Sequence, residues 1–275
     1  DAVYARYGVL NNNTHPLLIK MYKNIDRLNG FGYGMGNVLY GKKYVACGDS
    51  FTHGDTTGLV DSHGNSGEAS AEFFDVEWNM YKTYGWWIAR RNNMQFENKG
   101  VNGGVMALLK RYVDGEITNP DQNHPFSNLI YKEIPEDTDY LTIWYGINDS
   151  GNTYLGTIND TDNTTFYGAW NVVLPYLMEH HPFMKIGIIV TNHSSSQYRN
   201  AVREVAKKWG IPVLDLMGDS QIPMMGGGRE SSIGVCQEAV DLRNNAFKIS
   251  STNIHPKIKA HEYESTFIEN FLRSL

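Results

Sequence analysis

The sequence predicts an α/β fold built on a mostly parallel, five-stranded sheet. Its 275 residues are 41% hydrophobic and 12% aromatic, which is enough to bury the core of one large domain. Short β-rich apolar runs alternate with segments of helical spacing, a pattern typical of βαβ units around a buried sheet. The composition excludes a disordered, collagen-like or low-complexity chain.

The expected strands and helices alternate along most of the chain. The strands are predicted at residues 43–47, 94–97, 139–145, 184–190 and 211–215. The helices are predicted at residues 75–91, 104–112, 165–180, 195–209 and 256–272. In the last helix Tyr263, Phe267 and Phe271 are spaced four apart, and Pro256 suits a first helical position. This helix should pack back on the sheet.

Three segments do not follow this alternation: residues 1–42, 54–70 and 217–251. Long loops of compact α/β domains usually carry function or small elements of their own, so we expect these segments near the site. Residues 1–42 are predicted to form an N-terminal arm or linker packed on a domain that spans residues 43–275. A glycine-rich run at residues 30–36 indicates a hinge or tight packing within this arm.

Charge and hydropathy exclude several partners. The chain has 24 basic and 30 acidic residues and a formal net charge of −6, so nucleic acid is not expected as a partner. It has no run of 18 apolar residues, and no membrane partner is expected either. Cys47 and Cys236 are too few for a disulfide framework, which favours structural thiols. The compartment stays unknown, with a secreted or virion-associated protein as the working expectation.

Two stretches begin like ligand-binding motifs without completing them. Residues 36–43 match the start of a P-loop, but Lys43 stands in the place of the magnesium-binding Ser or Thr, and the stretch precedes a strand. His261 and Glu262 begin like a zinc-binding helix, yet Ser265 occupies the position of the second His. No metal site is therefore expected.

Ser50 is the candidate nucleophile. The first strand runs directly into Gly48, Asp49 and Ser50, at the sheet edge where open α/β folds bind ligands. The pattern is not the G-x-S-x-G elbow of α/β-hydrolases, because Thr52 stands in the place of the second glycine. A second Gly-Asp-Ser at residues 218–220 leads into a glycine-rich loop and is interpreted as a turn.

A serine nucleophile needs a base and an oxyanion hole. His255 precedes the last helix, where a loop can direct an imidazole at the sheet edge. Gly103 follows the second strand and can present a backbone N–H, and Asn148 follows the third strand and can donate from its amide. Each has an ordinary explanation as a turn glycine or a cap residue, so only their combination in this order favours catalysis.

In these four blocks the chain resembles the GDSL/SGNH hydrolase family, from about residue 43 to the C-terminus. The Gly-Asp-Ser of residues 48–50, Gly103, the G-x-N-D of residues 146–149 and the His-Pro at His255 are similar to its motifs. The resemblance implies a flavodoxin-like three-layer α/β/α sandwich, with residues 43–275 as an SGNH-type hydrolase domain. It also implies catalytic Ser50 and His255, an oxyanion hole of Ser50, Gly103 and Asn148, and ester hydrolysis without a cofactor.

One position departs from the family pattern. The last block of the family reads D-x-x-H, and Thr252 stands in the place of its Asp. A histidine acting as base needs an acceptor for the proton on its outer nitrogen. The candidates are the Thr252 hydroxyl, a main-chain carbonyl near Thr252 or Asn253, and the carboxylate of Asp241. We expect a neutral acceptor at the Thr252 turn, because the spacing to His255 is kept.

The sequence therefore predicts a serine esterase for small acyl esters, with O-acetyl groups on carbohydrate as the favoured substrate. The expected partner is an acetylated polysaccharide or another small-acyl ester. The 6 Trp and 17 Tyr suit stacking on sugars, and the candidates for this are Trp86, Trp87, Tyr145 and Trp170. Two alternatives stay open: a catalytically weakened carbohydrate-binding module of a larger surface or phage-tail protein, and a lipase or thioesterase.

Overall fold

The computed structural model describes residues 36–119, 125–191, 194–216 and 237–275. Most of the glycine-rich run of the arm, the second Gly-Asp-Ser and Cys236 lie outside these ranges. Cys47 is a buried free thiol within the first strand.

A five-stranded parallel sheet forms the centre of the molecule, as predicted. In spatial order its strands are β4 (Gln95–Gly100), β1 (Lys43–Gly48), β5 (Tyr140–Trp144), β6 (Lys185–Val190) and β7 (Val213–Asp215). Every neighbouring pair is parallel, and Tyr44 of β1 is in register with Phe96 on one side and Tyr140 on the other. The strand order reverses at β1, which is where open α/β sheets bind ligands.

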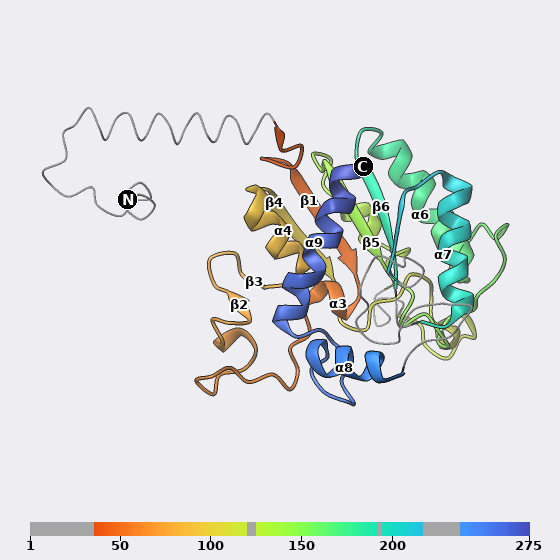
Figure 1. Ribbon diagram of the computed structural model, residues 1–275. Coiled ribbons are helices and arrows are strands. Elements are labelled where there is room, and N and C mark those ends of the chain that lie inside the picture. Colours follow the sequence, from red (N-terminus) through yellow and green to blue (C-terminus); the bar gives the residue numbers. More distant parts are fainter. Residues whose placement is uncertain (1–35, 120–124, 192–193, 217–236) are drawn as a thin grey trace, which may run out of the picture.

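Helices cover both faces of the sheet (Figure 1). On one face lie α4 (Tyr84–Asn92) and α9 (Ile258–Ser274), with Ile88 and Leu272 in the buried cluster beneath them. On the other lie α6 (Phe166–His180) and α7 (Ser196–Trp209), with Trp170 and Val202 in a second cluster. The fold is thus the predicted three-layer α/β/α sandwich, and α6, α7 and α9 lie close to their predicted bounds.

The predicted helix at 75–91 is wrong in its first half. Residues up to Tyr81 form a small antiparallel pair, β2 (Phe74–Asp75) and β3 (Met80–Tyr81), and α4 begins only at Tyr84. Asp75 Oδ1 accepts the N–H groups of Glu77 and Trp78 at 3.0 and 3.2 Å. Asn79 adopts a positive φ of 51°, so the chain turns back here instead of continuing a helix.

The predicted helix at 104–112 is also largely wrong, since only α5 (Lys110–Val113) is helical there. The N–H groups of Met106 and Ala107 donate to the buried carboxylate of Asp149, at 2.9 to 3.1 Å. These bonds replace the ones that a helix would make, and they tie the segment to the end of β5.

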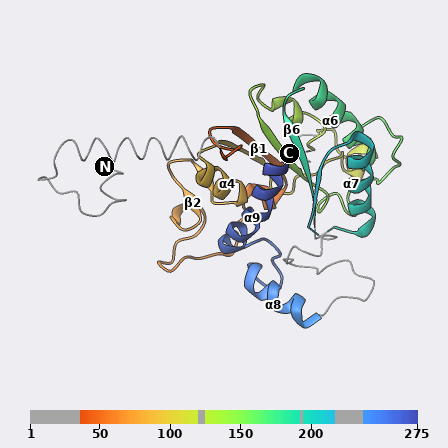
Figure 2. The same cartoon turned by 45° about the horizontal axis from the view of Figure 1, so that its top comes forward.

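Short elements fill the remaining connections. They are α3 (Ser50–His53), η1 (Gly67–Ala69), η3 (Ile130–Glu133) and α8 (Gln237–Phe247). Figures 1 and 2 both place α8 beyond the N-terminal end of α9, where the Phe247 ring stacks on Tyr263 at 5.2 Å. Within the described ranges, no helix has the length and apolar character needed to cross a membrane.

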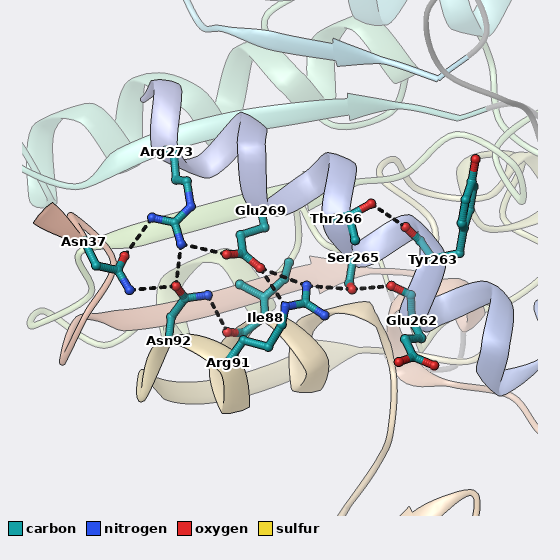
Figure 3. A network of polar contacts seen from close by, with 10 residues as sticks. All are labelled: Asn37, Ile88, Arg91, Asn92, Glu262, Tyr263, Ser265, Thr266, Glu269 and Arg273. Carbon is teal, nitrogen blue, oxygen red and sulfur yellow. Dashed lines mark hydrogen bonds and ion pairs between the residues drawn. The ribbon is translucent and has the colours of Figure 1, made fainter. Parts of the chain in front are cut away.

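A polar network fastens α9 to α4 (Figure 3). Glu269 of α9 accepts Arg91 of α4 at 2.8 Å and Arg273 of its own helix at 2.7 Å. Burial opposes ionisation, but the hydrogen bonds from these arginines hold the pKa of Glu269 below its usual range. The arginines also bond to Ser265, Asn92 and Asn37. Because α9 begins three residues after His255, the network also holds the segment that carries His255 against the sheet.

The described part of the N-terminal segment contacts the domain. Leu39 is fully buried, and Asn37 Nδ2 donates to Asn92 Oδ1 at 2.9 Å. The division of the chain at residue 42 stays a prediction, and residues 1–35 lie outside the described residues.

Candidate active site

Ser50 lies where β1 turns into α3, at the carboxyl edge of the sheet. Asp49 caps the helix, with its Oδ1 accepting the Phe51 N–H at 3.0 Å. Gly48 is required in this turn, because a Cβ there would overlap Thr52 Oγ1. The turn presents the Ser50 side chain at the end of the strand.

His255 contacts Ser50 directly, as the sequence predicted. His255 Nε2 lies 2.7 Å from Ser50 Oγ, across 205 positions of sequence. The Phe51 ring meets the imidazole edge-on, with centroids 5.5 Å apart. Burial lowers the pKa of His255, so the ring is neutral at pH 7 and can accept the serine proton.

A neutral side chain orients the imidazole. His255 Nδ1 lies 2.6 Å from Asn253 Oδ1. Asn253 Nδ2 donates to the Thr57 carbonyl at 2.8 Å, so the amide oxygen must face His255 and accept the Nδ1 proton. The lone pair of the neutral ring is then on Nε2, toward Ser50.

The acceptor is neutral and belongs to the Thr252 turn, as expected, but it is the Asn253 side chain and neither the Thr252 hydroxyl nor a main-chain carbonyl. Thr252 Oγ1 lies 3.3 Å from Ser250 Oγ, in a turn in which Ser250 Oγ also accepts the Asn253 N–H at 3.0 Å. This turn brings the Asn253 side chain to the ring. Asp241 lies on α8, where it lines a separate cavity of about 570 Å³.

A carboxylate lies beside the Nε2 atom of His255. Asp55 Oδ2 is 3.8 Å from Nε2, and Asp55 Oδ1 accepts the Thr57 N–H at 2.8 Å. Burial opposes ionisation of Asp55, but the hydrogen bonds from Thr57 hold its pKa below the usual range. Asp55 is thus ionised at neutral pH. The segment 54–70 therefore contributes to the site, as expected.

Three donors are available for an oxyanion. Within the described part of the chain, the N–H groups of Ser50 and Gly103 have no hydrogen-bond partner. Asn148 Nδ2 donates one hydrogen to the Gly104 carbonyl at 3.0 Å, which leaves the second amide hydrogen for a ligand. Gly103 and Asn148 line the same cavity of about 390 Å³. Their role as an oxyanion hole stays a prediction.

Asp149 holds together the two segments that carry Gly103 and Asn148. It is fully buried beside Asn148 and binds the Met106 and Ala107 N–H groups. Burial raises the pKa of Asp149 to about 7, although these N–H groups oppose the shift. Its carboxylate thus links the end of β5 to the segment that follows Gly103.

Three of the four aromatic residues proposed for sugar stacking are buried, and the fourth, Trp87, is half-buried. Tyr145 and Trp170 are completely buried, Trp86 is 8% exposed, and all three pack in the interior. A large α/β core contains many aromatic side chains even in proteins that bind no sugar, so the number of Trp and Tyr residues does not indicate a sugar site. Among the described residues no group of His, Cys, Asp or Glu side chains could hold a metal ion.

Asp55 and Thr57 were missed in the sequence. Both belong to a polar loop of Asp, Thr and Gly residues, a composition that is ordinary for turns. The one available signal was their position, immediately after the helix that carries the predicted nucleophile.

The fold and these side chains define an α/β/α sandwich with a Ser-His pair at its carboxyl edge. No family model and no curated protein matches the sequence. The structure is similar to a solved protein from Lactobacillus plantarum, at 22% identity and a TM-score of 0.58, covering 86% of this chain and 98% of that one.

The structure is also similar to two candidate GDSL-like lipases. The one from Bacteroides ovatus has 17% identity and a TM-score of 0.56, covering 86% of this chain and 99% of that one. The one from Bacteroides uniformis has 15% identity and a TM-score of 0.55, covering 86% of this chain and 97% of that one. The chain therefore has the fold of GDSL-like lipases.

Proposed function

We propose that the protein is a serine esterase of the GDSL/SGNH type, with residues 43–275 as its catalytic domain. The observation that carries the proposal is the continuous hydrogen-bond chain from Ser50 through His255 to Asn253. A serine held 2.7 Å from a neutral, oriented imidazole is the arrangement that nucleophilic acyl transfer requires.

The reaction follows from this geometry. His255 Nε2 removes the Ser50 proton as Oγ bonds to the ester carbonyl carbon, and the N–H groups of Ser50 and Gly103 with the Asn148 amide stabilise the oxyanion. The bond to the alcohol breaks, and the alcohol oxygen receives the proton from Nε2. A water molecule then repeats the sequence on the acyl-enzyme, releasing the carboxylic acid and free Ser50.

We favour small acyl groups, O-acetyl groups on carbohydrate in particular. The cavity beside Gly103 and Asn148 is lined by Lys110, Arg111 and Asn152, which suit a polar substrate. A long acyl chain needs an apolar channel. A lipase or thioesterase is therefore the weaker alternative.

The test compares p-nitrophenyl acetate with p-nitrophenyl palmitate, using Ser50→Ala as the matched control. Hydrolysis of the acetate alone supports the proposal, and loss of that activity in Ser50→Ala assigns it to this site. Equal hydrolysis of the palmitate indicates a lipase instead, and hydrolysis of neither indicates a binding module. Acetate release from a panel of acetylated polysaccharides then identifies the carbohydrate.

A further inference from the structure

We propose that Asp55 selects substrates by their alcohol, accepting a hydrogen bond from a hydroxyl next to the ester oxygen. This inference rests on the proposed esterase function and names its substrate class: monoesters of polyols and partly acylated carbohydrates. The proposed reaction assigns no step to this carboxylate.

The position of Asp55 is fixed by its own loop. Its N–H donates to the Ser50 carbonyl at 3.2 Å, and its Oδ1 accepts the Thr57 N–H at 2.8 Å. These two bonds direct Oδ2 toward His255, where it lies 3.8 Å from Nε2. The side chain keeps 19% of its surface exposed, so a substrate can reach it.

The resting histidine does not satisfy this carboxylate. Because Asn253 accepts the Nδ1 proton, Nε2 carries a lone pair, which accepts the Ser50 hydroxyl. Asp55 Oδ2 thus faces an acceptor at Nε2. Thr57 donates to the carboxylate from within the loop through its side chain and its N–H. On the side of His255, the donor would be a hydroxyl of the substrate. Two other imidazoles lie near the pair. His53 on α3 is close to Asp55, and His261 on α9 is close to His255 but is buried and neutral.

The reaction places the alcohol of the substrate at this point. His255 Nε2 must return its proton to the departing oxygen, which requires an approach of about 2.6 to 3.2 Å. The departing oxygen and Asp55 Oδ2 therefore both lie beside His255 Nε2. A hydroxyl on the adjacent carbon can donate to the carboxylate, whereas an ether cannot, and an anionic alcohol is repelled.

The experiment compares 2-hydroxyethyl acetate with 2-methoxyethyl acetate, whose alcohols differ in the donor and little in reactivity. The wild-type protein should prefer the hydroxy ester by about tenfold or more in kcat/KM, because the methoxy ester offers the carboxylate no hydrogen-bond donor and still displaces water from it. In Asp55→Asn the amide oxygen still accepts the Thr57 N–H, but an NH₂ group replaces the acceptor at the site. The preference should then fall to about one, while Glu77→Gln, an exposed charge control on the β2–β3 turn, keeps it.

Three results overturn the proposal. One is a wild-type protein that hydrolyses the hydroxy and the methoxy ester with the same kcat/KM. Another is an equal loss of kcat/KM on both esters in Asp55→Asn, which would mean that Asp55 acts only on His255. The third is the absence of any hydrolysis. Hydrolysis of p-nitrophenyl acetate, whose alcohol has no hydroxyl, separates the cases: failure there removes the esterase function itself, whereas failure of the ratio removes only the role of Asp55.

Discussion

Removal of the Asn253 side chain tests how the imidazole is oriented. Asn253→Ala deletes the acceptor 2.6 Å from His255 Nδ1 and leaves the Ser50 contact in place. The imidazole becomes positively charged during the reaction, and a hydrogen bond to a charged group contributes about 1.5 to 3 kcal/mol. We therefore expect kcat to fall by about 10- to 150-fold. Water can replace the lost acceptor, so the loss should stay below the roughly 10⁴-fold cost of a wrong tautomer.

The assay measures kcat and KM for p-nitrophenyl acetate. KM should change little, because Asn253 contacts the side of the imidazole that faces away from Ser50. Thr252→Ala is the matched control: it removes a neighbouring hydroxyl whose partner is Ser250, and its kcat should stay near that of the wild type. A wild-type kcat in Asn253→Ala, or an equal loss in Thr252→Ala, refutes the assignment of Asn253.

Three other changes test separate parts of the account. Asn148→Ala should lower kcat by about a hundredfold with little change in KM, and a rise in KM alone would assign Asn148 to substrate binding. Asp55→Asn should move the acid limb of the pH–rate profile to lower pH, since Asp55 raises the pKa of His255 against the effect of burial; an unmoved limb contradicts this coupling. Burial raises the pKa of Glu264 on α9 to about 8, so the folded protein binds a proton that the unfolded chain releases, and stability should fall as pH rises from about 4.5 to 8. Glu264→Gln should remove this fall and gain on the order of a few kcal/mol at pH 8 in denaturant unfolding, and an unchanged pH dependence argues against the buried carboxyl.

The sequence was sufficient for the sheet and for the main contact of the site. Strands such as β6 are continuous apolar runs, and burial on both faces makes such runs easy to recognise. The position of Ser50 follows from the same logic, because parallel strands bring their carboxyl ends to one edge of the sheet. His255 does not follow a strand, and it was found from the His-Pro pair that precedes the last helix.

Local hydrogen bonds decided the parts that the sequence did not predict. Helical spacing at 104–112 was overridden by Asp149, 43 positions away from Met106, which binds the N–H groups that a helix needs. The acceptor of His255 depended on how Ser250 turns the chain, and spacing alone cannot distinguish Thr252 from Asn253. Such side-chain to backbone bonds leave no periodic pattern in a sequence.

The most direct test of the central claim is covalent labelling by an alkyl fluorophosphonate, followed by mass spectrometry of the digested protein. The account predicts one adduct per chain, on Ser50, that is absent in Ser50→Ala and forms much more slowly in His255→Ala. No adduct on the folded wild-type protein, or an adduct on another residue, would contradict it.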